Sequence, residues 1–194
     1  MKWAFRLIVL LLSVTTAGSR ADTLMLCYGY GCKLAMPVSL SQADWAALRA
    51  LFPATRTAAE ERAAVAHAVG LFERIAGQVA PIHRDLAGNP LAVARQPGQL
   101  DCIAESLNTA AWLILLDQHG LLRWHRVVER AYRAPWVLDQ HWAARIEEVA
   151  TGQYYVVDSW PQDNGEPALI QTLEDWRAKL TPRQHQAMEN SPEL

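Results

Sequence analysis

The sequence is poor in charge, in cysteine and in long apolar runs. Charged residues make up 20% of its 194 positions, and a formal net charge of −2 offers no general attraction to nucleic acid. Beyond the N-terminal apolar run no segment is apolar for long enough to cross a bilayer as a helix, so we expect no stable membrane insertion of the mature chain. No internal repeat or low-complexity segment is present, and the length suits one domain. We therefore predict a single domain over residues 22–194, of undetermined oligomeric state.

The N-terminus has the pattern of a secretory signal peptide. Lys2 and Arg6 flank the start of an apolar run over residues 7–14, which is too short to span a bilayer. Ser19 and Ala21 place small side chains at the −3 and −1 positions of a cut after residue 21. The pattern predicts a signal peptide over residues 1–21 and a periplasmic or secreted product. An uncleaved anchor is the alternative, because Arg20 is unusual beside a cleavage site.

Export would place the three cysteines in an oxidising compartment. Cys27 and Cys32 enclose a Tyr-Gly-Tyr-Gly segment, whose glycines permit the tight backbone that a local disulfide needs. We predict this disulfide, with a reduced pair as the alternative, since so small a ring restrains little entropy. Cys102 is then left over. An odd cysteine in a secreted protein is either an intermolecular partner or a free reactive thiol.

The first half of the chain predicts helices. Residues 37–41 are interpreted as a turn, and Ser41 with Asp44 marks the start of a helix that Pro53 ends. Thr57 begins a longer helix with a 3.6-residue apolar period up to Pro81. A surface loop is expected over residues 81–99, where periodicity is lost. An apolar helix then begins near Asp101 and ends at His119-Gly120, with a middle that is apolar almost all round and therefore buried.

The second half predicts strands over residues 124–133, 141–149 and 154–158, which are rich in Val, Ile, Tyr and Trp. A short turn at Thr151-Gly152 makes the last two strands an antiparallel hairpin. A loop over residues 161–167 and a short helix near residues 172–180 follow. The economical fold class is α+β, with N-terminal helices packed on a small antiparallel sheet.

Cys102 is expected at the N-terminus of a helix, where partial positive charge stabilises a thiolate and the first N–H groups point outward. His141 begins one strand of the predicted hairpin and Asp158 ends the other, so the two residues should meet at the open end. A carboxylate there would hold the imidazole tautomer, as in a Cys-His-acid triad. Taken alone, each residue is more ordinary: a core cysteine, a structural histidine or a turn aspartate.

The order of these residues resembles the bacterial transglutaminase-like cysteine proteinases, in the transglutaminase-like branch of the papain-like enzymes. The resemblance rests on Gly98 to Cys102, on Gln140 to Ala143, and on Tyr154 to Trp160, within a region from Thr57 to Trp160. It implies a papain-like fold with the catalytic Cys102 at a helix N-terminus, His141 as base and then acid, and Asp158 as the orienting group. Calcium-using members carry acidic residues near the site, and this sequence has no clear set of them.

The resulting prediction is a thiol enzyme that cleaves or transfers peptide or glutamine amide bonds, most simply a cysteine protease acting on protein or peptide, with cell-wall peptides next. The Cys102 N–H would bind the oxyanion, helped by Gln96 or Gln99, and Trp142 and Trp160 would contact substrate. No cofactor and no metal are expected, because a zinc site from Cys102, His119 and His125 would lack recognisable ligand spacing.

A different class of function is a non-catalytic secreted module. It would keep the fold and bind a peptide or protein in a groove around Trp112, Trp142 and Trp160. The reactivity of Cys102 separates the two hypotheses, since only the enzyme requires an accessible, reactive thiol.

Overall fold

The computed structural model describes residues 22–53, 57–90, 92–94, 96–134 and 140–179. Within these residues the protein is α+β, with four α-helices and two antiparallel sheets of two and four strands. The predicted fold class is therefore confirmed at this level. The predicted signal peptide over residues 1–21 lies outside the described residues. Among the described residues, no helix combines the length and apolar character that a membrane crossing requires.

The two-stranded sheet was not predicted. Strand β1 (Asp22–Cys27) pairs with β2 (Ala35–Leu40), so the interpretation of residues 37–41 as a turn is wrong for residues 37–40. Proline is tolerated in β2 because each strand of a two-stranded sheet has a free edge, where the missing N–H of Pro37 breaks no ladder bond. Between the strands lies a 3₁₀ turn over Tyr30–Cys32, and the predicted Cys27–Cys32 disulfide closes it, with a Cα–Cα distance of 4.8 Å.

Helices α1 (Gln42–Ala50) and α2 (Ala58–Ala76) begin where their capping residues predict. The Ser41 side chain accepts the N–H of Asp44, and the Asp44 side chain accepts the N–H of Ser41 in return. Thr57 accepts the N–H of Glu60 at the start of α2. These bonds satisfy N–H groups that a helix start leaves without partners.

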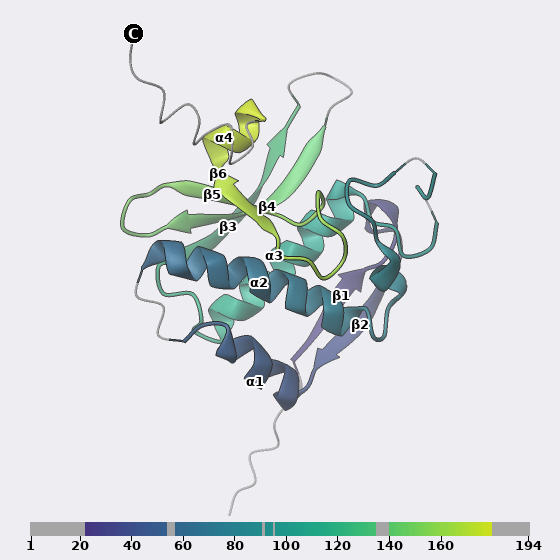
Figure 1. Ribbon diagram of the computed structural model, residues 1–194, viewed down its shortest axis with the longest axis horizontal. Helices are drawn as coiled ribbons and strands as arrows, with labels where there is room; N and C mark the ends of the chain where they lie inside the picture. The colour runs from purple at the N-terminus through teal and green to yellow at the C-terminus, as the bar shows by residue number, and fades with distance from the viewer. Residues whose placement is uncertain (1–21, 54–56, 91, 95, 135–139, 180–194) are drawn as a thin grey trace, which may run out of the picture.

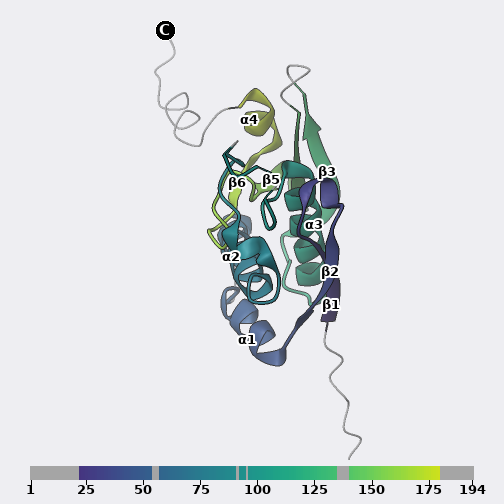
Figure 2. The ribbon, with the colours of Figure 1, turned by 90° about the vertical axis from the view of Figure 1, so that its right-hand side faces the viewer.

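Helix α3 (Cys102–Gln118) lies at the centre of the fold. It packs against strand β4 of the larger sheet, and it also contacts α2, β1 and the 3₁₀ turn at Tyr30–Cys32. Figure 2 places α3 between α2 and the β1–β2 sheet. Neighbours thus cover α3 on several sides, which agrees with the predicted burial of its apolar middle except at Ile114, which is 46% exposed.

The larger sheet has the order β3-β4-β5-β6, with every neighbouring pair antiparallel: β3 (His125–Arg133), β4 (His141–Glu148), β5 (Tyr154–Asp158) and β6 (Leu169–Thr172). The first three strands agree with the predicted ranges, whereas the edge strand β6 was missed. Helix α4 (Leu173–Ala178) follows β6 directly and contacts both β5 and β6. The end of the sheet where β4 begins and β5 ends is thereby partly covered.

Candidate functional site

Cys102 is the first residue of α3 and is half-buried. The carboxylate of Asp101 caps the helix by accepting the N–H of Ala104 at 2.9 Å. An N–H at the first helical position has no intrahelical acceptor, so the Cys102 N–H is available for another group. Asp101 also accepts the N–H of Gly31 at 2.9 Å, which ties the disulfide loop to the start of this helix.

His141 and Asp158 lie together at the open end of the β4–β5 hairpin. In the β4–β5 register Ala144 lies opposite Val157, and one further step brings Ala143 beside Asp158. Because side chains two residues apart on a strand share a face, His141 and Asp158 face the same way. His141 Nε2 lies 2.7 Å from Asp158 Oδ2, and both side chains are about 5% exposed.

The His141 ring also hydrogen-bonds the Cys102 side chain. Since Asp158 occupies Nε2, the other ring nitrogen, Nδ1, is the one left for the thiol. The structure thus brings together Cys102, His141 and Asp158, from three separate elements, in the order thiol, imidazole, carboxylate.

Two tryptophans enclose the imidazole. The ring of Trp160 lies 4.8 Å from that of His141, and the ring of Trp176 lies 5.5 Å from it. Trp176, from α4, also donates its indole N–H to Asp158 Oδ2 at 2.9 Å. The same carboxylate oxygen therefore accepts from both His141 and Trp176, which fixes its position.

These surroundings favour the charged imidazole. Burial alone lowers the pKa of His141, but the hydrogen bonds to Asp158 and Cys102 outweigh burial and raise it to about 9. A protonated imidazole beside the thiol is the arrangement that stabilises a thiolate.

An arginine of β3, Arg130, lies close to the thiol. Arg130 interacts electrostatically with Cys102, donates to the Ser106 hydroxyl at 2.8 Å, and stacks its guanidinium 4.8 Å from the ring of Trp142. The Ser106 bond anchors Arg130 one helical turn beyond the thiol. Its positive charge adds to that of the helix N-terminus.

The other predicted site residues have different surroundings. Trp160 touches His141, while Trp142 is half-buried against Arg130 and Tyr132. The buried Gln99 accepts the N–H of Leu86 at 3.3 Å and donates to the carbonyl of Arg84, so its amide holds the loop backbone.

The contacts of Gln96 and Trp112 are with other residues. Gln96 is exposed and donates to the Ala92 carbonyl at 3.4 Å. Trp112 is completely buried and stacks on Phe72 at 4.6 Å, so a groove lined by Trp112 is ruled out. Its side chain belongs to the core.

The remaining histidines of the zinc alternative are engaged elsewhere. His119 Nε2 lies 2.8 Å from Asp22, and His125 Nδ1 lies 2.9 Å from the buried Glu61. Across the described ranges, no three or more His, Cys, Asp and Glu side chains are grouped in a way that could hold a metal ion.

Three buried acids, which the sequence did not single out, lie behind the site. Glu105 accepts the Ser159 hydroxyl at 2.6 Å and hydrogen-bonds Asp85. Asp85 accepts the N–H of Leu100 at 2.7 Å, and Glu73 accepts the N–H of Gly165 at 2.8 Å. The cluster therefore joins α2, α3 and the loops that precede Cys102 and follow Asp158.

The acids hold on to their protons because the cluster is buried and contains three carboxyl groups. Burial raises the pKa of Glu73 to about 8 and that of Asp85 to about 6. Burial, with the neighbouring Glu73 and Asp85, also raises the pKa of Glu105 well above its ordinary value. In the folded protein these groups retain protons at pH values where an unfolded chain has released them.

The cluster predicts that the fold loses stability as the pH rises from about 4.5 to 8, because there the unfolded chain binds fewer protons than the folded one. We expect Glu105→Gln to raise the free energy of unfolding at pH 8 by about 1 kcal/mol or more, with a smaller effect at pH 4.5. Urea denaturation at both pH values measures this. Glu129→Gln, at an exposed acid, is the matched control, and an equal response of the two variants would contradict the cluster's role.

Neither Trp176 nor the acid cluster carried a recognisable signal in the sequence. Trp176 lies on a short helix that was predicted, but nothing in its spacing relates it to Asp158. Glu105 follows Cys102 by three positions, and an isolated glutamate on a helix is ordinarily a solvated residue.

The sequence matches no protein-family model, and neither a curated protein nor a solved structure matches it significantly.

Proposed function

We propose that this protein is an exported cysteine peptidase of the transglutaminase-like, papain-like type, in which Cys102, His141 and Asp158 form the catalytic triad. The observation that carries the proposal is the His141 ring, hydrogen-bonded to the Asp158 carboxylate on one nitrogen and to the Cys102 side chain as well. The Cys27–Cys32 disulfide supports export. The order of the three residues along the chain supports the family resemblance.

In the proposed reaction the Cys102 thiolate attacks the carbonyl carbon of a peptide or glutamine amide, and a carbon–sulfur bond forms. The Cys102 N–H, at the positive end of α3, stabilises the oxyanion that develops. The carbon–nitrogen bond then breaks as the His141 imidazolium protonates the leaving amine. Asp158, held by the indole of Trp176, keeps the imidazole oriented throughout.

The thioester is then hydrolysed. Water attacks the thioester carbon while neutral His141 accepts a proton, and collapse of the intermediate releases the carboxylic acid and restores the thiolate–imidazolium pair. An amine in place of water would give a new amide, so the identity of the second substrate separates hydrolysis from transfer. We take hydrolysis as the main reaction.

The proposal predicts rapid alkylation of Cys102 in the folded protein. At pH 6 we expect iodoacetamide to modify Cys102 at least about tenfold faster in the native state than in guanidinium-unfolded protein, because only the folded site places the thiol beside the charged His141 imidazole. Intact-mass spectrometry without reductant follows this thiol alone, since Cys27 and Cys32 are bridged. A thiol that reacts more slowly folded than unfolded would instead support the non-catalytic binding module.

A further inference from the structure

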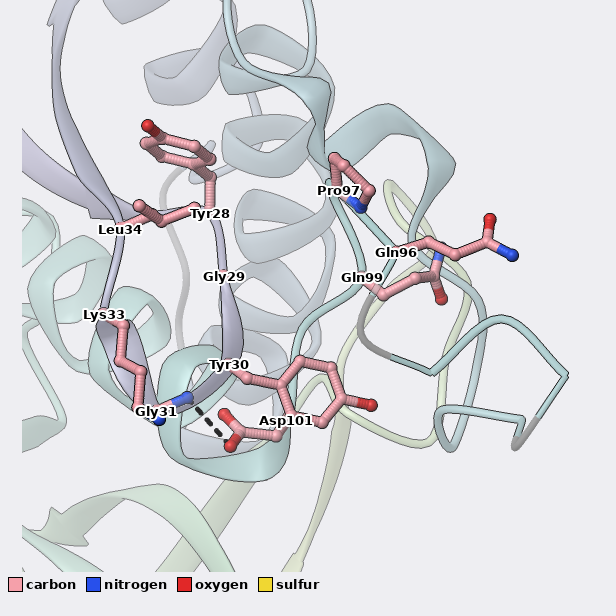
Figure 3. A pocket seen from close by; sticks show the side chains of 10 residues that line it. All are labelled: Tyr28, Gly29, Tyr30, Gly31, Lys33, Leu34, Gln96, Pro97, Gln99 and Asp101. Carbon is pink, nitrogen blue, oxygen red and sulfur yellow. Dashed lines mark hydrogen bonds between the residues drawn. The ribbon is translucent and has the colours of Figure 1, made fainter.

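A hollow of about 680 Å³ lies beside the start of α3. One wall is the disulfide loop, which we define as residues 27–34, and the other is the segment over residues 96–99 that leads to Cys102. Figure 3 shows Tyr28 and Leu34 on the first wall, Pro97 facing them on the second, and Tyr30 with Asp101 at the lower end.

Helix α3 fixes the disulfide loop at two points. Asp101, the residue before Cys102, accepts the N–H of Gly31. About two turns further along, the buried Asn108 accepts the N–H of Cys27 at 2.8 Å and donates to its carbonyl at 2.9 Å. The helix that carries the thiol therefore also positions the wall of the hollow.

The place of the imidazole decides which part of a substrate this hollow would meet. In the proposed reaction His141 protonates the leaving amine, so the leaving segment lies on the imidazole side of the thiol. The hollow is lined from residues 28–34 and 96–101, and no residue of β4 contributes to it. It ends at Asp101, the residue before Cys102, so under the proposed mechanism it would receive the acyl side of the substrate.

We propose that the hollow is the binding site for a side chain of the acyl segment, the part of the substrate on the amino side of the cleaved bond, and that it selects a bulky uncharged side chain, aromatic or aliphatic. This inference rests on the proposed function. The two tyrosine rings, Leu34 and Pro97 offer apolar contact.

Charge in the hollow favours a neutral occupant. Lys33 and Asp101 contribute one charge of each sign, and the two Asp101 oxygens already accept the N–H groups of Ala104 and Gly31. A cationic substrate side chain would find both Asp101 oxygens already bonded, and an anionic one could meet Lys33 only in a hollow that also holds the Asp101 carboxylate. Either would lose hydration against the apolar walls.

Peptidyl vinyl sulfones test the proposal. The Cys102 sulfur adds to the vinyl carbon, and the neighbouring carbon takes a proton from His141, so each probe reports binding of an acyl segment beside the thiol. The set carries phenylalanine or aspartate at either of two acyl-side positions, and intact mass gives the rate of modification. At one position we expect phenylalanine to react at least about tenfold faster than aspartate.

The variant Leu34→Asp places a carboxylate on one wall, at a side chain that is 51% exposed. We expect it to slow the phenylalanine probe at least about fivefold, with iodoacetamide unchanged within about twofold. Val79→Asp, at an exposed aliphatic residue (62%) that does not line the hollow, is the control and should match the wild type. Pro97→Asp, on the opposite wall, replaces Leu34→Asp if that variant fails to fold.

The outcomes separate the two proposals. A wild-type thiol that is inert to iodoacetamide overturns the proposed function. A thiol that reacts rapidly with iodoacetamide but modifies phenylalanine and aspartate probes at equal rates overturns only the assignment of the hollow, as does a preference that survives both wall variants.

Discussion

Replacing Cys102 with alanine is expected to lower the hydrolysis of fluorescein-labelled casein by at least about three orders of magnitude, since a triad without its nucleophile retains only the oxyanion donor and binding. The fold should survive the change, because the side chain is small and only half-buried. Release of soluble fluorescence measures the rate, and thermal unfolding checks the fold.

Ile103→Ala is the matched control, because Ile103 is the next residue of α3 and is 37% exposed. It should retain activity within a fewfold of the wild type. Hydrolysis by Cys102→Ala at the wild-type rate would remove the thiol from the mechanism, whatever the reactivity of Cys102 toward alkylating reagents.

The second large effect is expected from Asp158→Asn, which keeps the size of the side chain but removes the charge that His141 and Trp176 share. We expect kcat/KM for the same casein to fall by two to four orders of magnitude, roughly the cost of losing the orienting acid in other triads. Asp117→Asn, at an exposed acid of α3, should leave the rate unchanged. A fall of less than about threefold would assign Asp158 a structural role alone.

We also expect Asp158→Asn to change how the free energy of unfolding depends on pH. The pKa of His141 is raised from 6.5 to about 9 in the fold, so its charged form stabilises the native state below about pH 6.5, and this contribution is lost as the pH rises through about 9. A shift of that size corresponds to about 3 kcal/mol. Urea denaturation of wild type and Asp158→Asn should therefore differ most at pH 6 and converge at pH 9.5. A difference independent of pH would exclude the imidazolium–carboxylate pair as its source.

Local patterns predicted the helices and the hairpin well. Ser41 and Thr57 marked helix starts because a side-chain oxygen beside the first free N–H groups is a local requirement. The meeting of His141 and Asp158 also followed from one local feature, the short turn that makes β4 and β5 antiparallel neighbours. These parts needed no knowledge of distant contacts.

The missed parts depend on contacts between distant segments. Strand β2 carries Pro37 and borders a two-stranded sheet, so its own residues favour a turn until β1 pairs with it. The burial of Glu105 follows from Ser159 and Asp85, which lie 54 and 20 positions away in the sequence. The residue pattern within one segment does not indicate a contact with a distant segment. The hydrogen bond from Trp176 to Asp158 is another contact of this kind.

The hydrogen bond from Trp176 to Asp158 makes completion of the site depend on how far the chain has been synthesised. Cys102 is synthesised before His141 and Asp158, and α4 is the last described element along the chain. Until residue 176 has emerged, the carboxylate lacks one of its two donors and the imidazole lacks one of its aromatic neighbours. A chain that is interrupted or clipped before α4 would therefore carry Cys102, His141 and Asp158 without the indole that hydrogen-bonds the Asp158 carboxylate.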